Sequence, residues 1–109
     1  MAGMFARTGS VVLGKYNDPP MIGYFDVLIN RDTIFGNKFH IGVDGTRKEV
    51  CALYEAWAKK QMLKKGIFFK RIEDLRRRYK EGVSIRLLCH CFPKQCHGRT
   101  LMKLIMGQL

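Results

Sequence analysis

Residues 83–106 read VSIRLLCHCFPKQCHGRTLMKLIM, and this stretch decides the fold. Over residues 83–91 every second side chain is apolar or a cysteine, which is the side-chain period of a β-strand. Pro93 indicates a turn after the strand. Residues 98–106 then have the spacing of a short amphipathic helix. The apolar anchors of this helix are Leu101, Leu104 and Ile105.

Another strand and two longer helices are expected upstream. The run at 24–29 is short and rich in β-forming residues, which predicts a buried strand. Thr46 and Glu49 have the spacing of a capping box, so a helix is predicted to begin there and to end near Gly66. A further helix is predicted over 70–80.

The order of these elements indicates an α/β fold. Two strands that are separated by a helical crossover usually pair in parallel, so the strand at 83–91 is expected to lie parallel to the strand at 24–29. We expect a small single domain with a short, mainly parallel sheet flanked by helices. Residues 22–109 are predicted to form this domain. Residues 1–21 are predicted to be an irregular N-terminal segment, in which 10–13 are compatible with a short strand.

Composition narrows the class of protein. The chain has 109 residues, with 20 Lys and Arg against 9 Asp and Glu, so its formal net charge is +11. A hydrophobic fraction of 47% excludes a fully disordered chain. No apolar run approaches the roughly 20 residues that span a membrane, and the first ten residues lack the apolar centre of a secretory signal. We therefore expect a cytoplasmic protein with a polyanionic partner and no membrane partner.

Three cysteines and a histidine lie close together in the sequence: Cys89, Cys91, Cys96 and His97. Cys96 and His97 come at the expected start of a helix, where backbone N–H groups favour an anion or a thiolate. They are the candidate catalytic residues of a ligand pocket. A zinc site formed by all four residues is a second interpretation. Buried core cysteines beside a capping histidine are the third. Cys51 is predicted to be a small buried residue.

The same stretch resembles a family signature. Residues 89–98 carry C-x-C-x-P-x-x-C-H-G, which is similar to an uncharacterised family of small domains in bacteria and their phages. Residues 29–31 and 35–39 resemble that family's I-x-R and L/F-G-N-P-F motifs, with Lys38 in place of the proline. The resemblance covers about residues 22–106 and implies an α/β domain with no established activity. It also implies that one site is formed by Arg31, Gly36, Asn37, Arg47, Cys89, Cys91, Cys96, His97 and Gly98.

The expected topology brings two loops of this site together. If the two strands are parallel, the long loop at 32–45 and the Cys/His loop leave the same edge of the sheet. Arginine side chains there would bind a phosphate or a carboxylate, and an Asn beside a Gly would orient a polar ligand group. We therefore predict that one pocket is formed by Arg31, Asn37, Arg47, Cys96 and His97.

Residues 59–80 hold an excess of basic side chains, opposed within the segment by Glu73 and Asp74 only. We expect this charge not to be balanced by acids four residues away. A solvated helical face is the plain interpretation, and contact with a nucleic-acid backbone is the functional one. The candidate nucleic-acid contacts are Lys64, Lys65, Lys70, Arg71, Arg76, Arg77 and Arg78.

These features predict a phage- or bacterial-type protein that binds a nucleotide or nucleic acid through the Cys/His pocket and the basic helices. The hypothesis extends to an enzyme that acts on a nucleotide-like ligand, with zinc as the one cofactor that the residues suggest. The alternative is a phage-type interaction protein that binds and modulates an acidic host protein in the host cytoplasm. A pocket protein would lose its function when Cys96 or His97 is replaced, whereas an interaction protein would lose it on charge reversal around residues 76–78.

Overall fold

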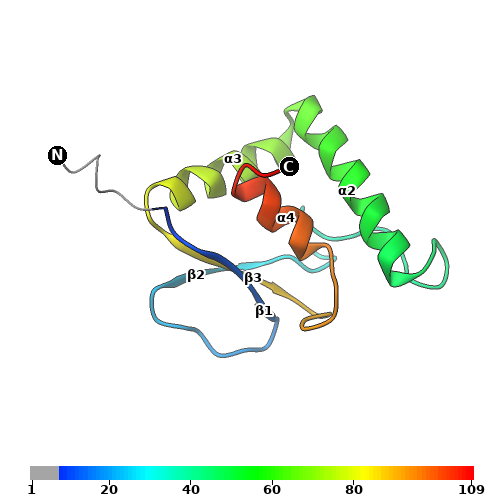
Figure 1. Cartoon of the computed structure of the whole chain (residues 1–109), viewed down its shortest axis with the longest axis horizontal. Helices are drawn as coiled ribbons and strands as arrows, with labels where there is room; N and C mark the ends of the chain where they lie inside the picture. Colours follow the sequence, from blue (N-terminus) through cyan, green and yellow to red (C-terminus); the bar gives the residue numbers. More distant parts are fainter. Residues whose placement is uncertain (1–7) are drawn as a thin grey trace.

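The computed structural model describes residues 8–109, which form a three-stranded sheet with helices packed on one face (Figure 1). The expected small α/β domain is therefore confirmed. In the described part of the chain, no helix has both the length and the apolar character needed to cross a membrane. The elements in chain order are β1 (Val11–Lys15), β2 (Tyr24–Leu28), α2 (Arg47–Lys64), α3 (Ile67–Lys80), β3 (Ser84–Cys89) and α4 (Gly98–Ile105).

The last strand in the sequence is the central strand of the sheet. The strand order is β1-β3-β2, and both outer strands run parallel to β3. Ile85 of β3 is the register partner of both Val11 and Phe25. The predicted parallel pairing of 83–91 with 24–29 is confirmed. The strand ends at Cys89, however, so Cys91 lies in the turn that follows and not on the face of the strand.

β1 lies inside the segment that was predicted to be irregular. All five of its residues have register partners on β3, and Val11 is buried in the core. The sheet therefore begins at Val11, upstream of the residue 22 at which the sequence led us to start the domain. Residues 1–7 of that segment lie outside the described residues. The run of β1 is short and contains a glycine, so its strand character depends on pairing with β3 more than on its own sequence.

Local sequence signals place the ends of the two long helices. The Thr46 hydroxyl accepts a hydrogen bond from the Glu49 N–H, and the Glu49 carboxylate accepts one from the Thr46 N–H, which confirms the capping box at the start of α2. Lys65 has a left-handed backbone conformation with φ 55° and ends the helix. α3 begins at Ile67, earlier than the predicted residue 70, because Phe68 turns into the core.

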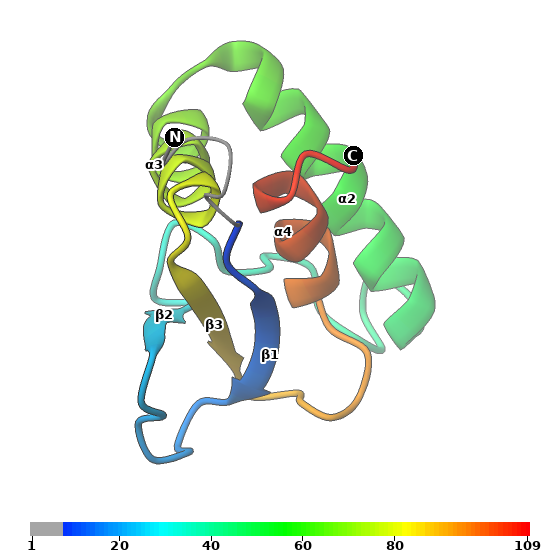
Figure 2. The same ribbon diagram turned by 60° about the vertical axis from the view of Figure 1, so that its left-hand side comes forward.

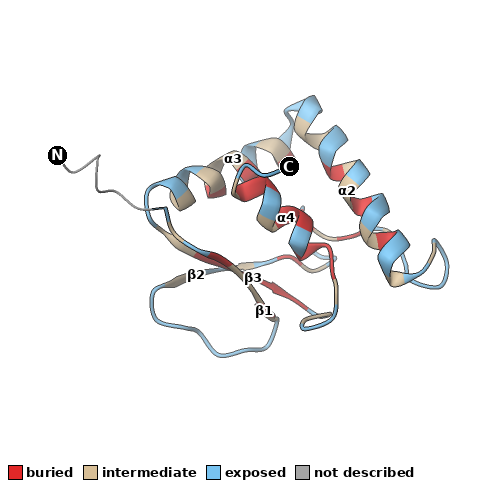
Figure 3. Ribbon diagram, viewed as in Figure 1, coloured by how far each residue is buried: buried red, intermediate tan, exposed pale blue. Residues whose placement is uncertain are grey.

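The helices cover one face of the sheet, and the hydrophobic core lies between the helices and this face (Figure 3). Tyr54 and Ala58 of α2 pack in the same cluster as Ile85 and Leu87 of β3. The predicted anchors of α4, Leu101, Leu104 and Ile105, are buried there as well.

The opposite face of the sheet carries an ion pair between a buried arginine and an exposed aspartate. Arg86 is 3% exposed, and its guanidinium donates to both carboxylate oxygens of Asp26, at 2.9 and 3.0 Å. The same group donates to the Pro19 carbonyl at 2.9 Å. The β1–β2 connection therefore lies over this face, away from the helices (Figure 2).

Candidate functional site

A cavity of about 400 Å³ opens at the carboxyl edge of the sheet. Its walls come from the loop after β2, the first turns of α2, the end of β3 and the loop before α4. The two loops and the start of α2 come together on one side of the molecule in Figure 1. All five residues that were predicted to converge line this cavity: Arg31, Asn37, Arg47, Cys96 and His97.

The loop after β2 is shaped by contacts with its own backbone and with α2. The Tyr54 hydroxyl donates to the Phe35 carbonyl at 2.6 Å, and this pair is buried. The Asn37 side-chain oxygen accepts from the Phe39 N–H at 2.9 Å. Gly36 does not line the cavity, but a Cβ there would lie 2.5 Å from the Arg31 Cα. Gly36 is therefore a positioning residue: only glycine lets the loop fold back on the segment that carries Arg31.

The two pocket arginines belong to different segments and keep free donor groups. The Arg31 Nη1 lies 2.7 Å from the His40 Nδ1, and the Arg47 Nη1 donates to the Gln95 carbonyl at 3.0 Å. Among residues 8–109 neither guanidinium forms an ion pair with a carboxylate. Each retains N–H groups and a positive charge that is not in contact with a carboxylate of the described residues, although Asp32 also lines the cavity.

His97 is held in one tautomer by the end of β2. Its Nε2 lies 2.6 Å from the Ile29 carbonyl oxygen, which can only accept, so the Nε2 carries the proton. Burial lowers the pKa of His97, the charge of Arg31 lowers it further, and the bond to Ile29 acts in the opposite direction. The ring is therefore neutral near pH 7, with a lone pair on Nδ1 and no hydrogen bond from that atom to any described residue.

Cys89 and Cys96 form a close pair of free thiols. Their Sγ atoms lie 3.0 Å apart, and the side chains are 1% and 4% exposed. The hydrogen bond from the Cys96 thiol lowers the pKa of Cys89, and the backbone N–H groups of Phe92 and Cys91 add to this against the effect of burial. The same thiol–thiol bond and burial raise the pKa of Cys96. The contact between the two thiols therefore favours the thiolate on Cys89, whereas the sequence led us to expect it on Cys96.

Gly98 explains why the Cys/His loop passes so close to the sheet. Its N–H donates to the Cys96 Sγ at 3.3 Å. A Cβ at Gly98 would lie 2.8 Å from Leu13 and 3.1 Å from Ile29, so a larger residue would push α4 away from β1 and β2. Gly98, like Gly36, positions the site without lining it.

The geometry does not favour the zinc interpretation. In residues 8–109 no group of three or more His, Cys, Asp or Glu side chains is arranged to hold a metal ion. His97 turns its Nε2 to a backbone carbonyl, and Cys91 has left the strand that carries Cys89. No hydrogen bond joins the Cys96 thiol to the His97 ring in the described residues, so the two do not form a nucleophile–base pair.

Cys51 is half-buried in the pocket wall and is not the core residue that the sequence suggested. It follows Arg47 by four positions, and residues at this spacing share one face of a helix. That spacing was the available signal for its place in the site. Burial raises the pKa of the Cys51 thiol, so it is not a second thiolate.

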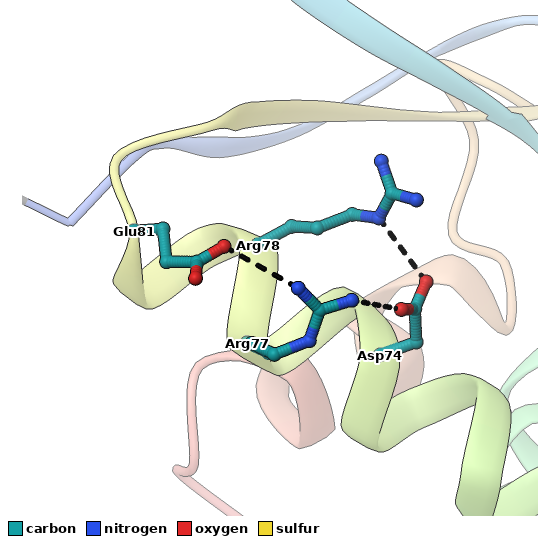
Figure 4. A network of polar contacts seen from close by, with 4 residues as sticks. All are labelled: Asp74, Arg77, Arg78 and Glu81. Atoms are coloured by element: carbon teal, nitrogen blue, oxygen red, sulfur yellow. Dashed lines mark hydrogen bonds and ion pairs between the residues drawn. The ribbon is translucent and has the colours of Figure 1, made fainter.

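The three consecutive arginines of α3 are neutralised within the chain. Arg77 pairs with Asp74 and Glu81, and Arg78 pairs with Asp74 (Figure 4). Arg76 pairs with Glu73. For these three arginines the expectation that nearby acids are lacking does not hold, because their partners lie three or four residues away along the helix.

Arg76 also connects α3 to α4 through hydrogen bonds. Its Nε and Nη2 donate to the Leu104 carbonyl at 3.2 and 2.7 Å. The rest of the predicted nucleic-acid surface lies around the α2–α3 junction and is exposed, with no ion pair to any described residue. It consists of Lys64, Lys65, Lys70 and Arg71, which we call the junction cluster.

One family model matches the chain, over residues 15–107, and its description is "Domain of unknown function (DUF4326)". No curated protein and no solved structure matches the chain. The match runs from the last residue of β1 past the end of α4, and so includes every segment that lines the cavity. The chain therefore belongs to the DUF4326 family, an uncharacterised family of the kind that its Cys/His and Gly-Asn motifs led us to expect.

Proposed function

We propose that the protein binds a small nucleotide-like anion in the pocket at the carboxyl edge of its sheet. The observation that carries this proposal is the pair of arginines, Arg31 and Arg47, that line one cavity without a carboxylate partner in the described residues. The cavity volume of about 400 Å³ lies within the range of small-molecule sites.

The walls of the pocket match the parts of such a ligand. The guanidinium groups of Arg31 and Arg47 supply charge-assisted hydrogen bonds for phosphate. The side-chain amide of Asn37 offers donors and the Nδ1 of His97 offers an acceptor, a combination that suits the edge of a base or a sugar. Phe39 and Ile41 add apolar surface for the flat face of a base.

Binding of nucleoside mono-, di- and triphosphates, measured by titration calorimetry, tests this proposal. Arg31→Gln is the informative variant, because Arg31 bonds to an exposed histidine and not to the core. We expect the Kd to rise at least about tenfold, the loss of one charge-assisted contact. Arg99→Gln is the matched control, since Arg99 is exposed and does not line the pocket. The proposal fails if no nucleotide binds, or if Arg31→Gln binds as tightly as the control.

A second candidate function is contact between a nucleic-acid backbone and the junction cluster. The observation that favours it is the concentration of four exposed basic side chains, without an ion pair to any described residue, around the junction of α2 and α3. The same charges suit an acidic host protein, which is the other class of partner. Salt-dependent binding to DNA or RNA that is equal across sequences separates a nucleic-acid backbone from a folded protein partner.

A further inference from the structure

The cysteine pair has a chemistry that the nucleotide-binding proposal does not use. Cys89 and Cys96 come from two different segments, the end of β3 and the loop before α4, yet their sulfur atoms lie 3.0 Å apart. A disulfide bond is about 2.05 Å long, so closing the bond needs a movement of about 1 Å. Both side chains line the cavity, which gives a small reagent access to them.

We propose that Cys89 and Cys96 form a reversible dithiol–disulfide centre that a small peroxide oxidises. The exposed fractions of 1% and 4% restrict the reagent to one that enters the cavity and approaches a nearly buried sulfur. Hydrogen peroxide satisfies this condition, whereas a bulky disulfide such as oxidised glutathione does not.

The reaction balances with peroxide as the oxidant. The Cys89 thiolate attacks one peroxide oxygen, the O–O bond breaks, and Cys89 becomes a sulfenic acid. The hydroxide that leaves takes the proton of the Cys96 thiol and departs as water. The Cys96 thiolate then attacks the Cys89 sulfur, the S–S bond forms and a second hydroxide leaves, which the solvent protonates. Two electrons pass from the two sulfurs to the peroxide. Two equivalents of a small external thiol, or one small dithiol, restore the dithiol by thiol–disulfide exchange and leave as their own disulfide.

The surrounding residues favour this pairing over the other cysteine combinations. The Gly98 N–H donates to the Cys96 Sγ and fixes its position against Cys89. Within the described residues, the Cys89–Cys96 contact is the one sulfur–sulfur hydrogen bond. Cys51 and Cys91 line the same cavity and serve as internal controls, because they meet the same reagent without that geometry.

Peptide mapping of the full chain tests the proposal. The purified protein is treated with hydrogen peroxide near pH 7, free thiols are alkylated, and the chain is cut with trypsin. Cleavage after Arg86, Lys94 and Arg99 places Cys89 and Cys91 on the peptide 87–94 and Cys96 on the peptide 95–99. We expect these two peptides to be joined, with fragmentation at His90 assigning the bond to Cys89. Treatment with dithiothreitol should separate them.

Single cysteine variants identify the two bonded cysteines without relying on peptide fragmentation. Cys91→Ser and Cys51→Ser should still form the crosslink, whereas Cys89→Ser and Cys96→Ser should not. Mapping of the wild-type chain keeps the test valid if either of the last two variants fails to fold. The proposal is overturned if peroxide produces no crosslink, an intermolecular one, or one that uses Cys51 or Cys91.

Discussion

The pocket and the three arginines of α3 both combine basic side chains with nearby polar groups, yet they differ in what those side chains are free to do. In the pocket, Arg31 contacts a histidine ring and Arg47 donates to a backbone carbonyl, and neither contacts a carboxylate of the described residues, so their charge stays available. On α3, Arg77 and Arg78 face carboxylates on their own helix. The comparison teaches that the partners of a basic residue, and not its frequency in a stretch of sequence, indicate a binding site.

The largest effect should come from breaking the pocket loop itself. Gly36→Ala places a Cβ against the backbone of Asn30 and Arg31, which cannot move without opening the loop. We expect the unfolding free energy to fall by about 3 kcal/mol. We also expect nucleotide binding to be lost. Ile34→Ala is the control in the same loop, because its side chain is exposed and should change stability by less than about 0.5 kcal/mol. Chemical denaturation measures both variants, and equal stability of the two would contradict the role of Gly36.

Charge reversal sharpens the comparison on the basic helices. Changing the junction cluster of Lys64, Lys65, Lys70 and Arg71 to Glu should weaken DNA binding at low salt by at least about tenfold and flatten its salt dependence. Reversal of Arg77 and Arg78 should have a smaller effect, since their charge is already compensated. Titration at several salt concentrations measures both. A larger loss of DNA binding at Arg77 and Arg78 than at the junction cluster would contradict the claim that ion-paired arginines contribute less to binding.

Arg76 should behave as a structural residue. Arg76→Ala removes two hydrogen bonds to the Leu104 carbonyl, which we expect to cost about 1–2 kcal/mol of unfolding free energy. Arg71→Ala, on the same helix but exposed, should cost less than about 0.5 kcal/mol. Thermal or urea unfolding of the two variants checks this difference. If Arg76→Ala is as stable as Arg71→Ala, the contact with α4 contributes nothing.

The smallest effect is a pH dependence that His97 contributes. Burial lowers the pKa of His97 in the folded protein, so the unfolded chain binds a proton more readily. Stability from this group is therefore complete above the ordinary histidine pKa and is lost as the pH falls below it. His97→Gln should reduce the decline in stability between pH 7 and pH 5, as measured by urea unfolding at several pH values. An unchanged slope in His97→Gln would show that the buried ring does not govern this transition.

The class of fold and the general location of the site could be predicted from the sequence. The capping box of Thr46 and Glu49, the alternation at 83–91 and the helical crossover depend on neighbours a few residues apart, and such patterns are visible in one dimension. The parallel pairing then requires the loops after β2 and β3 to leave the same edge of the sheet, and this is why the expected pocket residues meet.

Only the tertiary structure decided which atoms face each other across long sequence separations. It made β1 part of the sheet through pairing with a strand at the other end of the chain. It placed the Cys96 thiol against Cys89, a contact that lowers the pKa of Cys89 and raises the pKa of Cys96. It also brought the Arg76 guanidinium within hydrogen-bond distance of the Leu104 carbonyl. Hydrogen bonds and pKa values depend on distances of a few ångströms, and a sequence pattern specifies those distances only within a single helix or strand.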